Sequence, residues 1–197
     1  MIATLISKQV QSACNALQPL LIALVGSNGC GKSTLYKELL TTYQLPLVNA
    51  DEIGRQISGR YLSADDPFAY EAMKMADKTR YDLVHLRRSF IMETVLSDTV
   101  GSKLAFFKQA KDSGYWLFVI YIRLENAEIS SARVMQRVIE GGHDVASTKL
   151  HTRFPRTQAN AVQALRLANF GLVLDNSSFE TPFAFVEAWQ DGTPLRG

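Results

Sequence analysis

The chain has 197 residues, of which 47% are hydrophobic and 20% are charged, and its formal net charge is +2. This is the composition of an ordinary globular protein with a substantial core, and so small a charge does not favour nucleic acid or a membrane surface as a partner. No apolar run approaches the length of a membrane-spanning helix, and residues 1–8 lack the basic start and long apolar stretch of a signal peptide. The two cysteines, Cys14 and Cys30, indicate neither a disulfide framework nor a metal site. We therefore expect one cytoplasmic domain over residues 1–197.

Apolar runs of strand length recur along the chain between longer helical patterns. The apolar runs lie at 20–25, 45–50, 89–94, 115–124 and 170–175. The helical patterns cover 1–18, 32–42, 51–59, 66–88, 98–112, 126–140, 147–168 and 178–190. Because the apolar runs do not alternate with polar residues, we expect them to be buried on both faces, as in a parallel sheet covered by helices. The sequence thus predicts an α/β fold with a five-stranded, mostly parallel sheet that binds ligands at the carboxyl ends of its strands.

A glycine-rich loop follows the first predicted strand and leads into a predicted helix. The run matches the Walker A pattern GxxxxGK[ST] at every fixed position, and with the following threonine it comprises Gly26, Ser27, Asn28, Gly29, Cys30, Gly31, Lys32, Ser33 and Thr34. Between a strand and a helix N-terminus, small residues let successive backbone N–H groups turn towards a phosphate. Lys32 would neutralise the β- and γ-phosphates of a nucleotide, and the Ser33 hydroxyl would ligate Mg²⁺. The loop therefore predicts a site for nucleotide phosphates.

Two further predicted strands lead into acidic residues. Asp51 follows the second run, where it could accept a proton from a substrate hydroxyl or cap the helix that begins there. Glu93 and Thr94 end the third run, where a carboxylate needs either a task or a partner. Glu93 could bind a substrate hydroxyl, support Mg²⁺ or have a structural role. Residues 91–93 are a poor Walker B sequence, whereas residues 172–175 resemble one more closely but lie near the end of the chain.

Arginines gather around a sharp break at Gly141-Gly142, in a polar stretch between two predicted helices. Arg133 and Arg137 precede the break, and Arg153 and Arg156 follow it. The spacing of the first two places them on one helix face. Arginines of a lid can offset the charge of a transferring phosphoryl group, although most arginines on a helix belong to a solvated face. We expect one or two of the four to be functional, His143 to be a lid or structural residue, and the lid to span residues 138–156.

Six local strings coincide with one family. They are residues 26–34, Asn49-Ala50-Asp51-Glu52, Glu93-Thr94-Val95-Leu96-Ser97, Arg133-Val134 with Arg137-Val138, Gly141-Gly142-His143-Asp144-Val145 and Asp175-Asn176-Ser177. In this order the strings resemble the zeta-toxin family of P-loop kinases, in particular its small, free-standing bacterial members. The combination is much more specific than the Walker A pattern alone. The resemblance covers about residues 20–178 and implies a P-loop NTPase/kinase fold with a small lid.

The resemblance also implies an activity. The γ-phosphate of ATP would be transferred, with Mg²⁺, to a hydroxyl of a nucleotide-sugar, most simply UDP-N-acetylglucosamine. Lys32 and the loop amides would hold ATP, Ser33 would ligate Mg²⁺, and Asp51 would be the base that deprotonates the sugar hydroxyl. Glu93 and Thr94 resemble the segment that contacts the nucleotide-sugar.

Further implications concern the transferring phosphate and a protein partner. Arg137 resembles one of the arginines that stabilise this phosphate, and a second should follow the Gly-Gly-His segment, where both Arg153 and Arg156 fit. If the protein acts as a toxin, an antitoxin should block its ATP site.

The sequence departs from the small family members at two points. Ala146 stands where they often have proline, and the string Thr152-Arg153-Phe154 has one arginine where they often have a pair. These departures leave the acceptor open, so a nucleoside, an antibiotic or a dinucleotide is an alternative. A P-loop ATPase that acts through a protein partner is an alternative of another class, although a clear Walker B sequence and an LSGGQ-like string are both missing. A module that binds nucleotide without turnover is the remaining alternative.

Overall fold

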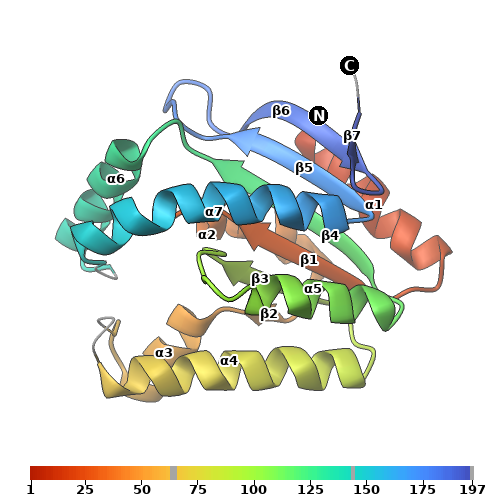
Figure 1. The fold of residues 1–197 in the computed structure, drawn as a ribbon, viewed down its shortest axis with the longest axis horizontal. Helices are drawn as coiled ribbons and strands as arrows, with labels where there is room; N and C mark the ends of the chain where they lie inside the picture. Colours follow the sequence, from red (N-terminus) through yellow and green to blue (C-terminus); the bar gives the residue numbers. More distant parts are fainter. Residues whose placement is uncertain (63–65, 143–144, 196–197) are drawn as a thin grey trace.

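A central sheet with helices on both faces forms the protein (Figure 1). The computed structural model describes residues 1–62, 66–142 and 145–195. Within these residues the sheet has seven strands in the order β2-β3-β1-β4-β5-β6-β7. The first five in this order are parallel, and β6 and β7 are antiparallel to their neighbours.

Each of the five predicted apolar runs contains one parallel strand. The bounds are β1 Leu20–Val25, β2 Leu47–Val48, β3 Phe90–Thr94, β4 Trp116–Arg123 and β5 Phe170–Asp175. The first strand lies between β3 and β4, and every residue of β1 is buried. Burial on both faces is the reason that its sequence shows no polar alternation. The predicted, mostly parallel sheet is confirmed, but the predicted number of five strands is wrong, because β6 and β7 extend the sheet to seven strands within the described residues.

The helices follow the predicted patterns closely. They are α1 Ile2–Asn15, α2 Lys32–Leu35, α3 Ala50–Ser58, α4 Pro67–His85, α5 Ser102–Asp112, α6 Ala127–Ile139 and α7 Ser147–Leu167. The helix predicted over 32–42 differs, because only its first residues are α-helical. A π-helical turn, Tyr36–Leu40, and a short 3₁₀ turn, Thr41–Tyr43, complete it.

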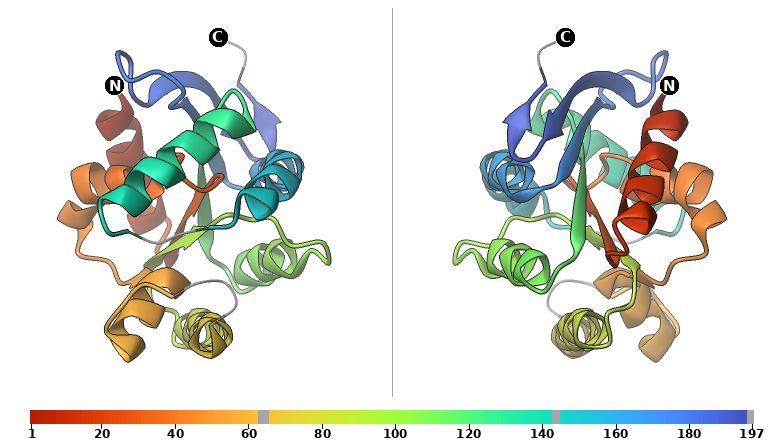
Figure 2. Two further views of the ribbon diagram at one scale, coloured as in Figure 1. Left: turned by 90° about the vertical axis from the view of Figure 1, so that its left-hand side faces the viewer. Right: turned by 90° about the vertical axis from the view of Figure 1, so that its right-hand side faces the viewer.

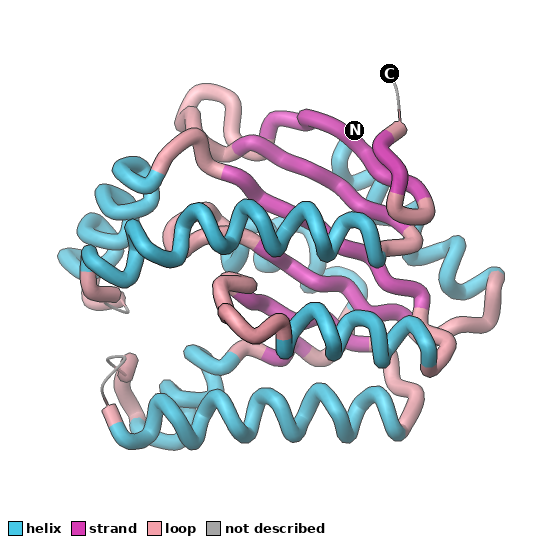
Figure 3. Tube along the Cα trace, in the orientation of Figure 1, coloured by secondary structure: helices cyan, strands magenta, loops and turns pink. Residues whose placement is uncertain are grey.

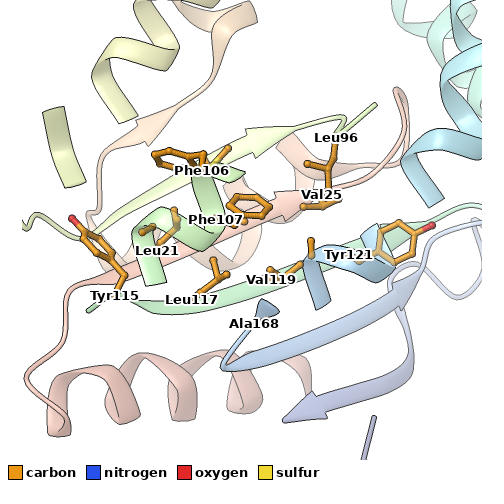
Figure 4. Close-up of a cluster of buried hydrophobic side chains, with 14 of the residues drawn as sticks. Leu21, Val25, Leu96, Phe106, Phe107, Tyr115, Leu117, Val119, Tyr121 and Ala168 are labelled. Atoms are coloured by element: carbon orange, nitrogen blue, oxygen red, sulfur yellow. The ribbon is translucent and has the colours of Figure 1, made fainter. Parts of the chain in front are cut away.

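Two apolar clusters cover the two faces of the sheet. On one face α4, α5 and α7 pack against the odd-numbered residues of β1 and β4, and Figure 4 shows Phe107 among Leu21, Leu117 and Val119. On the other face α1 and α2 pack against the even-numbered residues of the same strands. The side views in Figure 2 show these helix layers on opposite sides of the sheet. This alternation is the two-residue period of strands.

The closing helix predicted over 178–190 is wrong. The chain there forms an extended strand, β6 Ala184–Gln190, followed by β7 Thr193–Pro194. The predicted helix relied on apolar residues such as Val186 and Trp189, but both pack against the core from a strand that pairs with β5. Pairing satisfies the backbone groups of β5 that would otherwise form an open sheet edge. The helical pattern reflects only neighbouring residues, whereas pairing with the edge strand β5 determines that this segment is a strand.

The carboxyl ends of the parallel strands gather on one side of the sheet, at the left in Figures 1 and 3. The loops after β1 and β3 and the start of α3 meet there. Among the described residues, no helix has both the length and the apolar character needed to cross a membrane.

Candidate active site

The glycine-rich loop joins β1 to α2, and close contacts require its glycines. A Cβ atom on Gly26 would lie 2.4 Å from the backbone oxygen of Ile122, and one on Gly31 would lie 2.6 Å from Nδ2 of Asn176. Gly31 also has a φ of +100°, which residues with a Cβ rarely adopt. A larger residue at either position would push the loop away from β4 or from the segment after β5. The loop is thus packed tightly onto the strand ends.

Lys32 begins α2 and is held inside this loop. The residue is only 6% exposed, and its Nζ donates hydrogen bonds of 2.9 Å to the backbone oxygens of Gly26 and Ser27. Both acceptors are neutral carbonyls. An anionic oxygen is a stronger acceptor for an ammonium group than a carbonyl is. The Lys32 ammonium is therefore suited to replace its hydrogen bonds to these two carbonyls by hydrogen bonds to a bound phosphate.

A polar cluster connects the loop to the ends of β2 and β3. Ser33 Oγ donates to the Glu93 carboxylate at 3.1 and 3.2 Å, and Asn49 Nδ2 donates to the same carboxylate at 3.0 Å. Glu93 comes next to the loop because β3 pairs directly with β1, in register with Leu24. A hydroxyl and a carboxylate are oxygen ligands of the kind that Mg²⁺ prefers. Their chemistry fits the metal predicted at Ser33.

Residues 172–175, which match a Walker B sequence better than residues 91–93 do, are not part of this polar cluster. Asp175 ends β5, forms an ion pair of 2.8 Å with Arg123 and does not line the cleft described below. Burial alone would raise the pKa of Asp175, but hydrogen bonds from Ser177 and Arg123 outweigh it and lower the pKa. The strand next to β1 that carries a carboxylate towards Ser33 is β3, although its sequence is a poor Walker B match.

Asn49, and not Asp51, caps α3. The Oδ1 atom of Asn49 accepts hydrogen bonds from the backbone N–H of Asp51 at 2.8 Å and of Glu52 at 3.4 Å. The alternative that Asp51 is the cap is therefore wrong. Asp51 lies in the first turn, where its exposed side chain is free of any capping contact and lines the cleft.

A cleft of about 1060 Å³ extends from the loop between α3, α4 and the segment after β3. Predicted site residues from five elements and the loop line it together: Asn28, Gly29, Gly31, Lys32, Ser33, Thr34, Asp51, Glu93, Thr94, Arg137, Arg153 and Arg156. Three residues of the Walker A pattern do not line it. These are Gly26, Ser27 and Cys30, which are buried. Burial raises the pKa of the Cys30 thiol, although the nearby Lys32 charge acts in the opposite direction.

The predicted arginines reach the cleft from two helices, with Arg137 on α6 and both Arg153 and Arg156 on α7. The break between the helices supports Arg137 directly. The Gly142 N–H donates to the backbone oxygen of Arg137 at 2.8 Å, and a Cβ on Gly142 would lie 2.6 Å from Arg137 Cγ. His143 and Asp144 of the same string lie outside the described residues.

A second, smaller pocket of about 300 Å³ lies on the other side of the loop. Gly29, Gly31 and Thr34 line it together with the segment after β5. The Arg133 guanidinium lies over the Phe179 ring at 4.7 Å from its centroid, and both residues line the pocket. Arg133 thus belongs to this pocket as well as to the cleft.

Two side chains anchor the loop through contacts that the sequence did not predict, although one of them, Asn176, lies in one of the six family strings. The buried Asn176 donates from Nδ2 to the Cys30 backbone oxygen at 2.9 Å, and Ser130 Oγ donates to the Asn28 backbone oxygen at 2.7 Å. Each comes from more than 100 positions along the chain, so local patterns do not reveal it. Asn49 had a local signal, because asparagine before a predicted helix is a preferred cap.

The sheet order, the loop after its central strand and the cleft at the strand ends define a P-loop kinase, a phosphotransferase with a hydroxyl acceptor. Residues 4–169 match the family model described as Zeta toxin. The chain therefore belongs to the zeta-toxin family. A Haemophilus influenzae protein described as uncharacterized is 30% identical over 129 residues, which are 66% of this chain and 88% of that protein.

Solved structures share the fold. A chain from the PezAT chromosomal toxin–antitoxin system of Streptococcus pneumoniae has a TM-score of 0.58 and 19% identity, over 80% of this chain and 68% of that one. A chain of the AvrRxo1-ORF1:AvrRxo1-ORF2 structure with sulphate ions has a TM-score of 0.64 and 17% identity, over 98% and 68% of the two chains. The same pair with ATP matches with a TM-score of 0.61 and 18% identity, over 90% and 60%.

Proposed function

We propose that this zeta-toxin family member transfers the γ-phosphate of ATP to a hydroxyl of a nucleotide-sugar, with UDP-N-acetylglucosamine as the leading acceptor. One observation carries the proposal. The ammonium of Lys32, the carboxylates of Asp51 and Glu93, and arginines of α6 and α7 all line one cleft. A donor phosphate, a base for the acceptor hydroxyl and cations for the transferring group are the parts that phosphoryl transfer needs.

ATP would lie across the loop. The loop amides and Lys32 would bind its β- and γ-phosphates, and the pocket beside Phe179 would receive the adenine base. Its position supports this assignment, because it shares Gly29, Gly31 and Thr34 with the phosphate-binding loop. An aromatic ring and a guanidinium plane are surfaces on which a base can stack.

Magnesium would be held by Ser33 with support from Glu93. When bound, Mg²⁺ would supply positive charge that offsets the charge of the phosphate groups. The contribution of the chain is the placement of the two oxygen donors. Asn49, which follows β2, donates to the same Glu93 oxygen as Ser33 does and so helps to hold the carboxylate in place.

Asp51 would act as the base. It would take the proton of the acceptor hydroxyl while the oxygen forms a bond to the γ-phosphorus and the bond to the bridging oxygen of ADP breaks. Its exposed side chain supports this role, because Asn49 and not Asp51 supplies the cap of α3. Arg137, with Arg153 or Arg156, would offset the charge of the phosphoryl group.

The test compares phosphate transfer by three variants under identical ATP and Mg²⁺ concentrations. Lys32→Ala should abolish transfer, and Asp51→Asn should lower kcat by about two to four orders of magnitude, as expected for a lost general base. Glu52→Gln is the matched control, because it lies in the same turn but pairs with Arg55. Full turnover by Asp51→Asn on the true acceptor, while Lys32→Ala is inactive, would refute the role of the base.

The acceptor is tested separately. A panel that contains UDP-N-acetylglucosamine, a nucleoside, an aminoglycoside antibiotic and a dinucleotide is incubated with labelled ATP. Transfer to UDP-N-acetylglucosamine supports the leading proposal, and transfer to another member replaces it. ATP hydrolysis without transfer, stimulated by a protein partner, would instead support a P-loop ATPase.

A toxic role and an antitoxin partner are a further part of the proposal. They rest on membership of the family and on the fold shared with a chain of a toxin–antitoxin system. If the protein is a toxin, its expression should arrest growth and Lys32→Ala should relieve the arrest. Equal growth of cells that express the wild type and Lys32→Ala would argue against toxicity without affecting the kinase activity.

A further inference from the structure

Two cationic side chains line the cleft described above, one from α4 and one from α5. These two helices lie side by side in Figures 1 and 2. Arg80 comes from α4 and Lys103 from the first turn of α5, and both line the cleft. Both contact the same carboxylate oxygen, Oδ1 of Asp77, with Lys103 Nζ at 2.5 Å and Arg80 Nη1 closer. One acidic side chain is thus shared by two basic side chains.

The guanidinium of Arg80 is deeply buried, but not all of its N–H donors have a hydrogen-bond acceptor. The residue is 3% exposed, and its Nε is buried without a hydrogen-bond partner among the described residues. Burial lowers the pKa of Arg80, because the charged form loses its hydration. An arginine carries five N–H donors, and a buried donor without an acceptor costs free energy. The described part of the chain leaves this cost uncompensated.

The other acidic residues of the cleft do not balance this pair. Asp66 forms an ion pair with Arg60. Within the described residues, Arg80 and Lys103 form their ion pairs with Asp77 and not with Asp98, whose Oδ1 accepts the backbone N–H of Ser102 at 2.8 Å. Asp51 and Glu93 lie at the loop end of α3 and at the end of β3, where the reaction is proposed. The cluster of Arg80, Lys103 and Asp77 therefore has one positive charge in excess.

We propose that Arg80 and Lys103 form an anion site that binds a phosphate or carboxylate group of the acceptor while the acceptor hydroxyl faces Asp51. This inference rests on the proposed kinase function and narrows it. An arginine with free donors and a neighbouring ammonium recognise oxyanions by charge-assisted hydrogen bonds. The site would select acceptors such as a nucleotide-sugar or a dinucleotide, and it would reject a nucleoside or an aminoglycoside, which carry no anionic group.

The first test measures acceptor binding with the ATP site saturated by AMP-PNP and Mg²⁺. Wild type should bind UDP-N-acetylglucosamine more tightly than uridine or N-acetylglucosamine. Lys103→Gln should weaken binding of UDP-N-acetylglucosamine about tenfold, since a hydrogen bond to a charged group is worth at least this factor. The affinity for AMP-PNP should not change. Equal affinity of wild type and Lys103→Gln for UDP-N-acetylglucosamine would overturn the proposal.

Lys108→Gln is the matched control, because it removes the same charge from the same helix at a side chain that is 72% exposed. It should bind all three compounds as wild type does. Arg80→Gln should have a larger effect than Lys103→Gln, but its deep burial makes unfolding a risk. Lys103→Gln carries the test because its side chain is 18% exposed and Arg80 still pairs with Asp77 in that variant.

A second measurement needs no acceptor and no turnover. Inorganic phosphate, compared with sodium chloride of equal ionic strength, should raise the melting temperature of AMP-PNP-loaded wild type and Lys108→Gln by about 3–6 °C at ten times its Kd. The rise should be lost in Lys103→Gln, and an equal rise in all three proteins would overturn the anion site. If this difference holds but no acceptor is phosphorylated, the proposed kinase function fails and the anion site stands. If transfer occurs and Lys103→Gln behaves as wild type does, the anion site alone fails.

Discussion

Replacement of Asn49 by alanine should remove two interactions at once. The first is the cap of α3, whose loss costs about 1 kcal/mol. The second is the hydrogen bond from Nδ2 to the Glu93 carboxylate, and a bond to a charged group is worth about 1.5–3 kcal/mol. The sum of about 3 kcal/mol corresponds to a melting temperature lower by about 6–12 °C in a chain of this size. Thermal unfolding followed by circular dichroism measures the shift.

Two variants separate the contributions. Asn49→Ser keeps a capping oxygen but loses the contact with Glu93, so its melting temperature should fall by roughly 60–75% as much. Asn49→Asp also keeps the cap, but it places a second carboxylate against Glu93, and like charges there should weaken the transferase activity most. The reasoning is refuted if Asn49→Ala melts within about 1–2 °C of wild type, which is well below the expected shift. It is also refuted if Asn49→Ser is as unstable as Asn49→Ala.

Four further predictions concern the loop and its surroundings. Gly26→Ala should destabilise the protein by about 3 kcal/mol in urea unfolding, because its Cβ would overlap the Ile122 oxygen, and a normal urea midpoint would contradict the close contact. A thiol reagent should modify the exposed Cys14 rapidly and the buried Cys30 only on unfolding, and two fast thiols would disprove the burial. The pKa of Cys30 in the folded protein is raised above its ordinary value of 9.0, so the unfolded chain loses the thiol proton at a lower pH than the folded protein does. The free energy of unfolding should therefore fall as the pH rises above 9.0, and Cys30→Ala should make this fall less steep. Phe179→Ala should raise the KM for ATP about tenfold if the base stacks there, and an unchanged KM would move the base elsewhere.

Most of the fold could be predicted from the sequence because its signals are local. Unbroken apolar runs marked the five parallel strands, and the run from 20 to 25 ends where β1 ends, at Val25. The Walker A pattern marked the loop because a tight turn against strands needs glycine at fixed places. The helix predicted over 178–190 was wrong, because a strand with apolar residues on one side and a short amphipathic helix have similar compositions.

The candidate site could be predicted only in part. Lys32 was identified from the Walker A pattern, and Asp51 and Glu93 from their places at the ends of strands, and all three line the cleft. The sequence did not indicate that Asn49 would hold Glu93 and cap α3 together. It also gave no sign of Arg80, which is one of several basic residues on an otherwise ordinary helix.

The sequence by itself determined which segments would be the five parallel strands, where a phosphate loop would form and which family the chain resembles. These features depend on residues that are near one another along the chain. The tertiary structure decided which carboxylate would meet Ser33, because strand order brought β3 and not β5 beside β1. It also decided that one carboxylate, Asp77, would be shared by cations from α4 and α5. Such pairings depend on the packing of elements that are distant in the sequence, and local sequence patterns do not predict that packing.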